Sequence, residues 1–190
     1  MSGRRKVCVV LTTRGNYGKM KSPMRAIRAH PALELQLVVA GGILLPRHGD
    51  YARVIEGDGF TIDRRVYFLV EGDDPVAMAK SAGLATIEVG HTLDVLRPDV
   101  VLVIADRYEA LAIALAAACM NVPIAHLEGG EVSGSVDESL RHAISKLAHL
   151  HFLANEEAAE RLRRMGEWSA TVVVVAPRAW ISWSTSISTT

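Results

Sequence analysis

Short, β-branched apolar runs alternate with helical segments along the whole chain, and this alternation is the strongest constraint on its fold. Lys6–Thr12 (KVCVVLT) and Val100–Ile104 (VVLVI) are nearly unbroken apolar runs, as expected for strands buried on both faces of a sheet. Further strands are predicted at Leu33–Ala40, Arg65–Val70, Val122–Leu127 and His151–Ala154, and helices at Lys19–Ala29, Pro75–Leu96, Ala110–Met120, Ser135–Ala148 and Asn155–Met165. Parallel strands joined by helical crossovers form a Rossmann-like α/β fold, with a parallel sheet flanked by helices.

Composition excludes several classes of protein. The 190 residues carry 21 basic and 21 acidic side chains, so the chain lacks the excess of positive charge on which nucleic-acid binding depends. No apolar run approaches the ~18 residues that a membrane span requires. Cys8 and Cys119 lie in apolar stretches and match no metal or redox spacing. We therefore expect a cytoplasmic, reduced protein with no membrane, nucleic-acid, metal or redox-cofactor partner.

Four carboxylates are the strongest candidates for chemistry. Asp106 and Glu128 follow closely on predicted strands, Glu131 lies in the next loop, and Asp137 falls in the first turn of a predicted helix. The carboxyl ends of parallel strands share one edge of the sheet, where ligands bind. Carboxylates that converge there raise one another's pKa values and can supply both an acid and a base. Their structural alternatives are helix capping by Asp106 and a favourable helix-dipole interaction at Asp137.

The loop after the first strand is a second candidate site. Thr13–Lys19 (TRGNYGK) contains two glycines and precedes a predicted helix. A helix N-terminus attracts anions, and Arg14 adds a positive charge. The loop matches neither the dinucleotide fingerprint nor the P-loop, so by itself it is a weak signal for phosphate binding.

The histidines do not form a recognisable metal motif. His126, His142, His149 and His151 are irregularly spaced, and no cysteine lies near them. We expect His142 and His149 on an exposed or interfacial helix face. His126 ends a buried strand two residues before Glu128, so it is retained as a polar group of the site.

The segment Ser135–Glu138 (SVDE) has the form of a capping box. In that motif the serine accepts a hydrogen bond from an early helix amide, and the glutamate reaches back to the cap. We therefore expect a helix that begins here and extends to about Ala148.

The last 23 residues differ from the rest of the chain. All three tryptophans lie there, and seven of the nine residues from Ser182 to Thr190 are Ser or Thr. We expect a Rossmann-like domain over residues 1–167 and an atypical tail over residues 168–190, with Val172–Val175 as a possible strand. A flexible Ser/Thr tail is the simpler interpretation.

A frameshift is the alternative interpretation of this tail. With ordinary codons, a shift of one frame turns Ala179–Thr190 into Leu-Asp-Leu-Leu-Val-Asp-Leu-Asp-Leu-Asp-Asp, an acidic amphipathic segment. The hypothesis is a frameshift near Pro177–Ala179 that ended the product early. Sequencing the coding DNA tests it, because synonymous codons incompatible with that second frame would exclude it.

Four stretches of the sequence carry a family resemblance: TTRGNYGKM at Thr12–Met20, GDYARVIEGDGF at Gly49–Phe60, ADRYEALAIALAA at Ala105–Ala117 and HLEGGEVSGSVDESLRHAISKLAHLH at His126–His151. Together they resemble the hydrolysing UDP-N-acetylglucosamine 2-epimerases of sialic acid biosynthesis. The resemblance covers roughly Lys6–Met165, and Ala105 departs from the glycine usual before Asp-Arg.

The resemblance implies the first half of a glycosyltransferase-B type fold, with the second, nucleotide-binding domain absent from this chain. The implied reaction converts UDP-N-acetylglucosamine and water into N-acetylmannosamine and UDP through a 2-acetamidoglucal. Asp106, Glu128 and Asp137 match the three acidic catalytic positions of the family. The substrate contacts implied by the same stretches are Arg14, Lys19, Arg107, His126, Glu131, Arg141 and His142. A homo-oligomer, dimer or tetramer, is also implied, and the helix from Ala110 or the Ser135 helix is available as its interface.

Several alternatives remain open from the sequence. The chain alone is expected to be nearly inactive, because a site without its nucleotide-binding wall loses the binding energy that positions the sugar. A non-catalytic truncated domain is therefore one alternative. A non-hydrolysing epimerase or one acting on a differently substituted UDP-sugar is another, although the motif EGGEVSG favours the hydrolysing group. A receiver-like signalling module is disfavoured, because Thr13 and Arg14 stand where its acidic residues would be.

Overall fold

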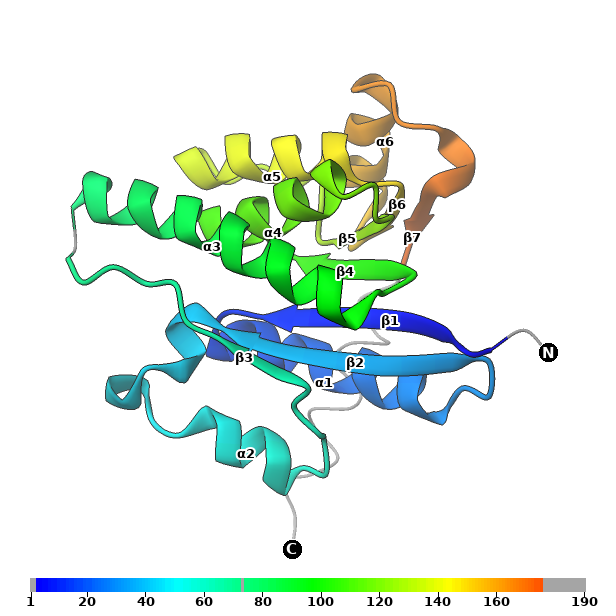
Figure 1. The fold of residues 1–190 in the computed structure, drawn as a ribbon. Helices are drawn as coiled ribbons and strands as arrows, with labels where there is room; N and C mark the ends of the chain where they lie inside the picture. Colours follow the sequence, from blue (N-terminus) through cyan, green and yellow to red (C-terminus); the bar gives the residue numbers. More distant parts are fainter. Residues whose placement is uncertain (1–2, 73, 176–190) are drawn as a thin grey trace, which may run out of the picture.

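A computed structural model describes residues 3–72 and 74–175, and in this part of the chain seven parallel strands form one sheet (Figure 1). The order across the sheet is β3-β2-β1-β4-β5-β6-β7. The strands are β1 (Arg5–Leu11), β2 (Leu33–Ala40), β3 (Arg64–Val66), β4 (Val100–Ile104), β5 (Ile124–Leu127), β6 (Leu150–Leu153) and β7 (Val172–Val174). The predicted Rossmann-like parallel sheet is therefore confirmed.

Helices cover both faces of the sheet. They are α1 (Arg14–Ala29), α2 (Tyr51–Gly57), α3 (Pro75–Leu96), α4 (Tyr108–Cys119), α5 (Val136–Leu147) and α6 (Glu156–Arg164), with short 3₁₀ turns η1 (Gly41–Leu44), η2 (Pro46–His48) and η3 (Ser169–Thr171). Figure 1 shows α3, α4 and α5 together on one side of the sheet, and α1 and α2 on the other. Helix α6 packs beside β6 and β7.

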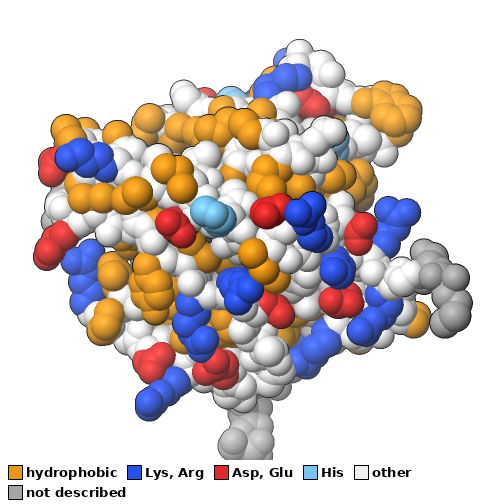
Figure 2. Space-filling view, viewed as in Figure 1, with side chains coloured by type: hydrophobic (Ala, Val, Ile, Leu, Met, Phe, Trp, Pro, Cys, Tyr) orange, Lys and Arg blue, Asp and Glu red, His pale blue; other side chains and the backbone are white. Residues whose placement is uncertain are grey.

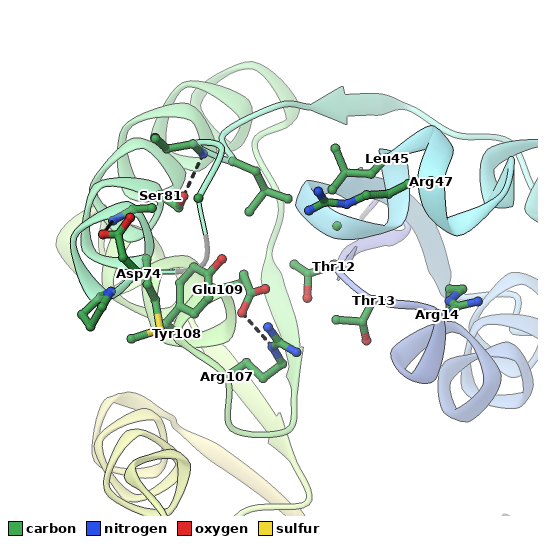
Figure 3. Close-up of a pocket in the computed structure, with 17 residues that line it drawn as sticks. Thr12, Thr13, Arg14, Leu45, Arg47, Asp74, Ser81, Arg107, Tyr108 and Glu109 are labelled. Carbon is green, nitrogen blue, oxygen red and sulfur yellow. Dashed lines mark hydrogen bonds and ion pairs between the residues drawn. The ribbon is translucent and has the colours of Figure 1, made fainter.

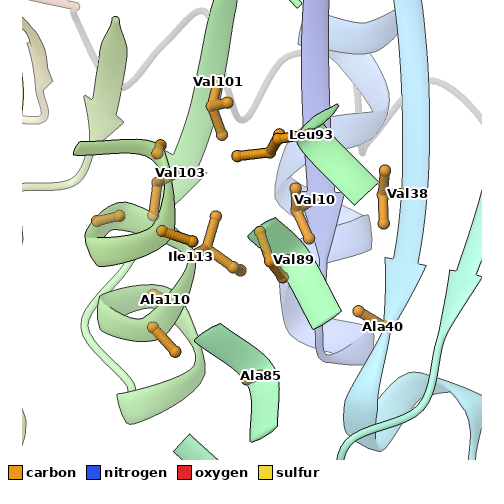
Figure 4. Packing of buried hydrophobic residues seen from close by; sticks show 14 of the residues in the cluster. Val10, Val38, Ala40, Ala85, Val89, Leu93, Val101, Val103, Ala110 and Ile113 are labelled. Carbon is orange, nitrogen blue, oxygen red and sulfur yellow. The ribbon is translucent and has the colours of Figure 1, made fainter. Parts of the chain in front are cut away.

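The strand residues alternate between two hydrophobic cores. Val10, Val101 and Val103 point toward α3 and α4, where they meet Val89 and Ile113 (Figure 4). Val9, Leu11, Leu102 and Ile104 point to the other face and pack against Met20 and other apolar residues of α1 and α2. Because side chains alternate along a strand, a strand that is buried on both faces must be apolar at every position. This explains why the runs VCVV and VVLVI contain no charged residue.

The small residues of α4 bring this helix close to its neighbours. Ala110, Ala112, Ala114, Ala116 and Ala117 are all buried, so α4 presents little side-chain volume to the sheet and to α3. The close packing of α3, α4 and the central strands fixes the carboxyl end of β4, from which a predicted catalytic residue extends.

The order of strands reverses between β1 and β4. The chain proceeds from β1 toward β2 and β3 on one side, and then returns through α3 to β4 on the other. In open parallel sheets the crevice at such a reversal is the usual ligand site. The loops that follow β1 and β4 both open there. The first leads through Thr13 into Arg14 at the start of α1, and the second contains Ala105–Asp106.

Helix α1 begins five residues earlier than predicted. The Thr13 hydroxyl oxygen accepts a hydrogen bond from the backbone N–H of Asn16 at 3.2 Å, so Thr13 is the N-cap and Arg14 is the first helical residue. The two glycines of TRGNYGK, Gly15 and Gly18, therefore lie inside the helix rather than in a loop. The predicted start at Lys19 was wrong because threonine is a strong N-cap, and its signal outweighs the low helix propensity of the glycines.

The capping box predicted at Ser135 does not form in its expected geometry. Ser135 is the N-cap of α5, but its side chain makes no capping hydrogen bond. The Glu138 carboxylate instead accepts hydrogen bonds from the backbone N–H groups of Ser133 and Gly134, both at 2.8 Å. These bonds, with that of Gly134 the larger cause, lower the pKa of Glu138. Glu138 thus holds the loop before the helix.

The sheet continues beyond residue 167. Val172–Val174 pairs in parallel with β6, so part of the segment that the sequence sets apart as a tail belongs to the sheet. The frameshift hypothesis concerns Pro177–Thr190, which lies outside the described residues. Among the described helices, none has both the length and the apolar character needed to span a membrane.

Candidate active site

Asp106 lies at the carboxyl end of β4, where it is paired with a cation. The Arg141 guanidinium of α5 donates to the Asp106 carboxylate and also to the Glu131 carbonyl, the latter at 2.7 Å. The Arg141 side chain is 8% exposed and that of Asp106 is 20% exposed. Burial lowers the pKa of Arg141, although an arginine remains charged at neutral pH all the same. This pair therefore fixes the Asp106 carboxylate relative to α5.

Glu128 occupies the equivalent place at the end of β5. Its backbone is left-handed, with φ of 60°, which is unusual for a residue other than glycine. Its side chain lies 2.7 Å from the Lys19 ammonium of α1. Both groups are partly exposed, so the pair stands at the surface of the sheet edge. Strained backbone of this kind is concentrated at functional sites in proteins.

Asp137 is positioned by α5. It lies in the first turn of the helix, four residues before Arg141, and residues four apart lie on the same helix face. The residue that holds Asp106 and the third predicted catalytic carboxylate therefore share one face of α5. Asp106 comes from the crossover between β4 and β5, whereas Glu128 and Asp137 both come from the crossover between β5 and β6.

The expected convergence of carboxylates takes a different form in the structure. The groups in contact with Asp106 and Glu128 are the cations Arg141 and Lys19, rather than a second carboxylate. The reason is topological, because α1 and α5 bring basic residues to the same edge. The sequence shows the carboxylates at strand ends, but it does not show which helix faces them.

A cleft of about 560 Å³ opens at the strand reversal, next to these residues. Figure 3 shows Thr12, Arg47, Arg107, Tyr108 and Glu109 around it. Of the ten predicted site residues, Arg14 and Arg107 line this cleft. Asp106 immediately precedes Arg107, so the carboxylate group adjoins the cleft without being part of its wall.

Two arginines, one on α1 and one on η2, bring positive charge to the cleft. Arg14 is in the first turn of α1, which contains no acidic residue, and its guanidinium lies 5.7 Å from the centre of the Tyr51 ring. Arg47, from η2, also lines the cleft. A helix N-terminus with added arginines is suited to an anionic group such as a diphosphate.

Glu109 is a site residue that the sequence reasoning missed. It is 2% exposed, and its carboxylate accepts a hydrogen bond from Arg107 Nε at 3.1 Å. Burial first, and then the nearby Glu109 charge, raise the pKa of Tyr108. A glutamate in the first turn of a helix suggests only a dipole interaction, so nothing in the sequence marked it as buried in a cleft wall.

His126 does not reach the surface of the site. Its side chain is completely buried. Nε2 lies 2.9 Å from the Ala105 carbonyl oxygen, and Nδ1 lies 3.1 Å from Ser145 Oγ. Burial lowers its pKa from 6.5 to about 4, so the ring is neutral at physiological pH. The expectation that His126 contacts substrate does not match this placement.

The remaining predicted residues have mixed placements. Glu131 is half-buried and supplies its backbone carbonyl to Arg141. His142 is also half-buried, and its Nδ1 has no hydrogen-bond partner within the described residues. His149 is exposed, but it lies in the bend between α5 and β6 rather than on the expected helix face, and its Nδ1 accepts a hydrogen bond from the Ile124 amide at 3.2 Å. Across residues 3–72 and 74–175, no cluster of three or more His, Cys, Asp or Glu side chains is arranged to hold a metal ion.

The parallel sheet, its strand order and the charged edge at the reversal define an α/β protein of the kind that binds nucleotides and their sugar conjugates. Comparison with known families narrows this class. Residues 25–176 match the family model described as UDP-N-acetylglucosamine 2-epimerase. The chain therefore belongs to the UDP-N-acetylglucosamine 2-epimerase family.

Curated relatives support the same assignment. The chain is 39% identical over 171 residues to the UDP-N,N'-diacetylbacillosamine 2-epimerase (hydrolyzing) of Legionella pneumophila, covering 90% of this chain and 45% of the relative. It is 36% identical over 165 residues to the GDP/UDP-N,N'-diacetylbacillosamine 2-epimerase (hydrolyzing) of Campylobacter jejuni, covering 86% and 43%. The UDP-N-acetylglucosamine 2-epimerase of Neisseria meningitidis is 35% identical over 163 residues, with 86% and 42% covered. The chain thus spans somewhat less than half the length of these relatives.

Solved structures confirm the fold. A crystal structure of a UDP-N-acetylglucosamine 2-epimerase superposes with a TM-score of 0.80 at 21% identity, covering 90% of this chain and 48% of that one. The Neisseria meningitidis enzyme bound to UDP-GlcNAc superposes with a TM-score of 0.78 at 21% identity, covering 89% and 45%. The described sheet corresponds to the first Rossmann-like half of the glycosyltransferase-B type fold.

Proposed function

We propose that this chain carries the sugar-side half of a hydrolysing UDP-2-acetamido-sugar 2-epimerase. The observation that carries the proposal is the pairing of Asp106 with Arg141 and of Glu128 with Lys19 at the ends of adjacent strands. Two relatives named as hydrolyzing enzymes support the reaction type. The proposed products are UDP and a free 2-acetamido sugar of inverted configuration at C2.

The reaction requires a base and a proton donor on a sugar. A base removes the proton from C2 while the bond from C1 to the UDP oxygen breaks, which leaves a 2-acetamidoglucal and UDP. Water then adds, with its hydroxyl to C1 and a proton to C2 from the opposite face. The C2 proton is weakly acidic, so removing it depends on a precisely held carboxylate.

Asp106, Glu128 and Asp137 are the residues proposed for these proton transfers. Asp106 and Glu128 each face a cation, which holds the carboxylate in place beside the cleft. Arg14, Lys19 and Arg107 are proposed to neutralise charge on the diphosphate as UDP leaves. Glu131, Arg141 and His142 are proposed to support the sugar side of the site from the loop before α5 and from α5 itself.

UDP-N-acetylglucosamine is the proposed substrate, with N-acetylmannosamine as the product and sialic acid-type biosynthesis as its use. UDP-N,N'-diacetylbacillosamine is the second candidate, because relatives 36% and 39% identical to this chain are named for it. The two sugars differ at C4 and C6, far from the C2 chemistry. A coupled assay with both substrates at equal concentration separates the two candidates.

The test of the proposal is UDP release by the purified chain, with an Asp106→Asn, Glu128→Gln double variant as the blank. We expect little turnover by the 190 residues, because the matched relatives are about twice as long and remote binding energy positions the reacting sugar. Release at rates comparable to a full-length relative would contradict this expectation. Release equal to the blank, from a chain that circular dichroism shows to be folded, would support it.

A homo-oligomer is also proposed, with α3 as its interface. Ile87 and Val95 of this helix are 61% and 58% exposed, and apolar side chains gather on this face of the molecule in Figure 2. Lys80, Ile87 and Asp94 are seven residues apart and so lie on one helix face. In an antiparallel copy centred on Ile87, each Lys80 would lie opposite the partner's Asp94, as a two-fold axis requires.

Sedimentation velocity tests this interface. Ile87→Glu is expected to convert the oligomer to monomer, whereas Val54→Glu, at a valine of α2 that is 49% exposed, is expected to leave it unchanged. A monomeric wild-type chain, or equal behaviour of the two variants, would exclude the interface.

A cytoplasmic location is proposed on the basis of the cysteines. Cys8 and Cys119 are both free thiols, one buried and one exposed. Unpaired cysteines are typical of reducing compartments.

A further inference from the structure

His126 links three separate segments next to the predicted catalytic carboxylates. A carbonyl oxygen can only accept a hydrogen bond, so Nε2 carries the ring proton and donates it to Ala105 at 2.9 Å. On its other side, Nδ1 lies 3.1 Å from the hydroxyl of Ser145, which is 3.0 Å from the Arg141 carbonyl. The ring therefore joins the loop after β4 to helix α5.

The Ala105 carbonyl is held at a strained point of the backbone. Ala105 has φ of 69°, in the left-handed region that an alanine rarely occupies. The peptide bond from Ala105 to Asp106 is planar, so the direction of this carbonyl determines where the Asp106 backbone begins. A fixed carbonyl at residue 105 thus fixes the direction from which the Asp106 side chain extends.

Helix α5 contacts both the Asp106 carboxylate and the His126 ring. Arg141 pairs with the Asp106 carboxylate, and Ser145, one turn later on α5, contacts the His126 ring. Gly129 packs directly against the His126 ring and Ser145: a Cβ added at Gly129 would lie 2.9 Å from His126 Nδ1 and 2.8 Å from Ser145 Oγ. The ring therefore has little freedom to move. The turn at Ala105 is therefore held from two sides by rigid elements.

We propose that His126 is a positioning residue for Asp106, which acts by donating the Nε2 proton to the Ala105 carbonyl and so maintaining the left-handed turn before Asp106. It does not contact substrate. The consequence of this positioning for catalysis rests on the proposed function, but the positioning itself does not, because it can be measured in the chain without substrate.

The first measurement needs no variant. Nitrogen-15 NMR of the histidine rings reports which nitrogen carries the proton. The proposal requires the Nε2–H tautomer at His126, neutral from about pH 5 to pH 8. A proton on Nδ1 would leave Ala105 without its donor and would overturn the proposal.

The second measurement follows the Asp106 carboxyl group by carbon-13 NMR in a set of variants. His126→Leu removes the donor and is expected to shift the apparent pKa of Asp106 by about half a unit or more, because its pairing with Arg141 is disturbed. His126→Gln, which can present an N–H at the same place, is expected to restore the wild-type titration. Ser145→Ala leaves the Nε2 contact intact and is expected to titrate as wild type.

A rescue variant separates positioning from simple core packing. Ala105→Gly removes the conformational penalty of the left-handed turn, so it is expected to restore the Asp106 titration in the His126→Leu background. If His126→Leu lowers the melting temperature but leaves the Asp106 titration unchanged, His126 only fills the core and the proposal is wrong.

UDP release provides the catalytic readout. His126→Leu is expected to lower any release by about tenfold through misplacement of Asp106, and His126→Gln to recover it. Turnover of neither substrate is what the proposed function expects of this chain, and the two NMR measurements then decide the positioning role. The proposed function itself fails if UDP-N-acetylglucosamine causes no saturable NMR shifts at the carboxyl edge of the sheet.

Discussion

The Arg141 guanidinium lies against the Asp106 carboxylate although 35 positions separate the two residues in the sequence. Asp106 lies in the loop after β4, and Arg141 is on α5, after a further strand. This contact joins two crossover units of the sheet at the point where the predicted chemistry takes place. It also leaves little of the arginine in contact with water.

Replacing Arg141 is expected to destabilise the fold. Arg141→Met leaves the Asp106 carboxylate and the Glu131 carbonyl without their donor, at a cost of about 2–4 kcal/mol in the free energy of unfolding. Urea denaturation measures this cost. Arg164→Met, at a side chain that is 78% exposed, is the matched control and is expected to change the value by less than about 0.5 kcal/mol. If the two substitutions lowered the free energy of unfolding equally, the contact between Arg141 and Asp106 would contribute nothing to stability.

Gly130 and Gly134 provide a test of close backbone packing. Both have positive φ, at 74° and 68°. A Cβ at Gly130 would lie 2.6 Å from the Ala158 carbonyl oxygen, whereas nothing lies within 4 Å of a Cβ at Gly134. Gly134→Ala is expected to cost about 1 kcal/mol from backbone strain alone. Gly130→Ala is expected to cost about 2–4 kcal/mol, because α6 must shift away.

Thermal or urea unfolding distinguishes the two glycine variants. If both variants lost a similar amount of stability, α6 would be able to move at no cost in free energy. The close approach of Ala158 to Gly130 would then not contribute to the stability of the fold.

Folding stability is expected to fall in mild acid because of His126. Its pKa is lowered from 6.5 to about 4 in the folded chain, with burial as the main cause. The unfolded chain therefore binds more protons between these values, so the free energy of unfolding is highest above pH 6.5 and falls as the pH drops toward 4. Between pH 6.5 and pH 5 the loss from His126 is about 1.5 kcal/mol.

The His126→Gln variant isolates the contribution of His126 to the pH dependence of the free energy of unfolding. His151, whose pKa is also lowered by burial, titrates in both proteins, so the difference between their urea-unfolding curves reports His126. Identical pH dependence in the two proteins would contradict a neutral, buried His126.

Lys19 is expected to matter for ligand binding more than for folding. Its side chain is 52% exposed, and ion pairs of this kind contribute less than about 1 kcal/mol to stability. The free energy of unfolding of Lys19→Met is therefore expected to differ from that of the wild type by less than this amount. The same substitution is expected to weaken binding of UDP-N-acetylglucosamine by about tenfold, because a positive charge beside the diphosphate is lost. NMR titration measures the affinity, and Arg164→Met on α6, at a side chain that is 78% exposed, is the control for a lost surface charge.

Most of the sheet could be predicted from the sequence because its strands are buried on both faces. Val100–Ile104 and Leu33–Ala40 were predicted with the bounds that the structure shows, since an unbroken β-branched run has few alternatives. The predicted strand Arg65–Val70 is shorter, at Arg64–Val66, because it is an edge strand with one neighbour. Asn155 caps α6 as expected, accepting from the Ala158 amide at 2.8 Å.

The site was predicted less completely, because contacts between distant segments leave no local signal. The ends of β4 and β5 indicated Asp106 and Glu128, but their partners Arg141 and Lys19 depend on how α5 and α1 pack. His126 was identified as polar and near the site, yet its burial arises because β4 and β6 flank β5 in the sheet and α5 packs on it. The cleft wall at Glu109 and Arg47 could not be predicted, because it combines α4 with a 3₁₀ turn 60 residues earlier in the chain.

The measurement that tests the account most directly is an NMR titration of the labelled chain with UDP-N-acetylglucosamine, with every amide followed. The account predicts saturable shifts concentrated at the carboxyl edge between β1, β4 and β5, around Arg14, Lys19, Asp106 and Glu128, which are lost in the Asp106→Asn, Glu128→Gln variant. Saturable shifts at the opposite edge of the sheet, or none at millimolar ligand, would contradict the assignment of this edge as the sugar-nucleotide site.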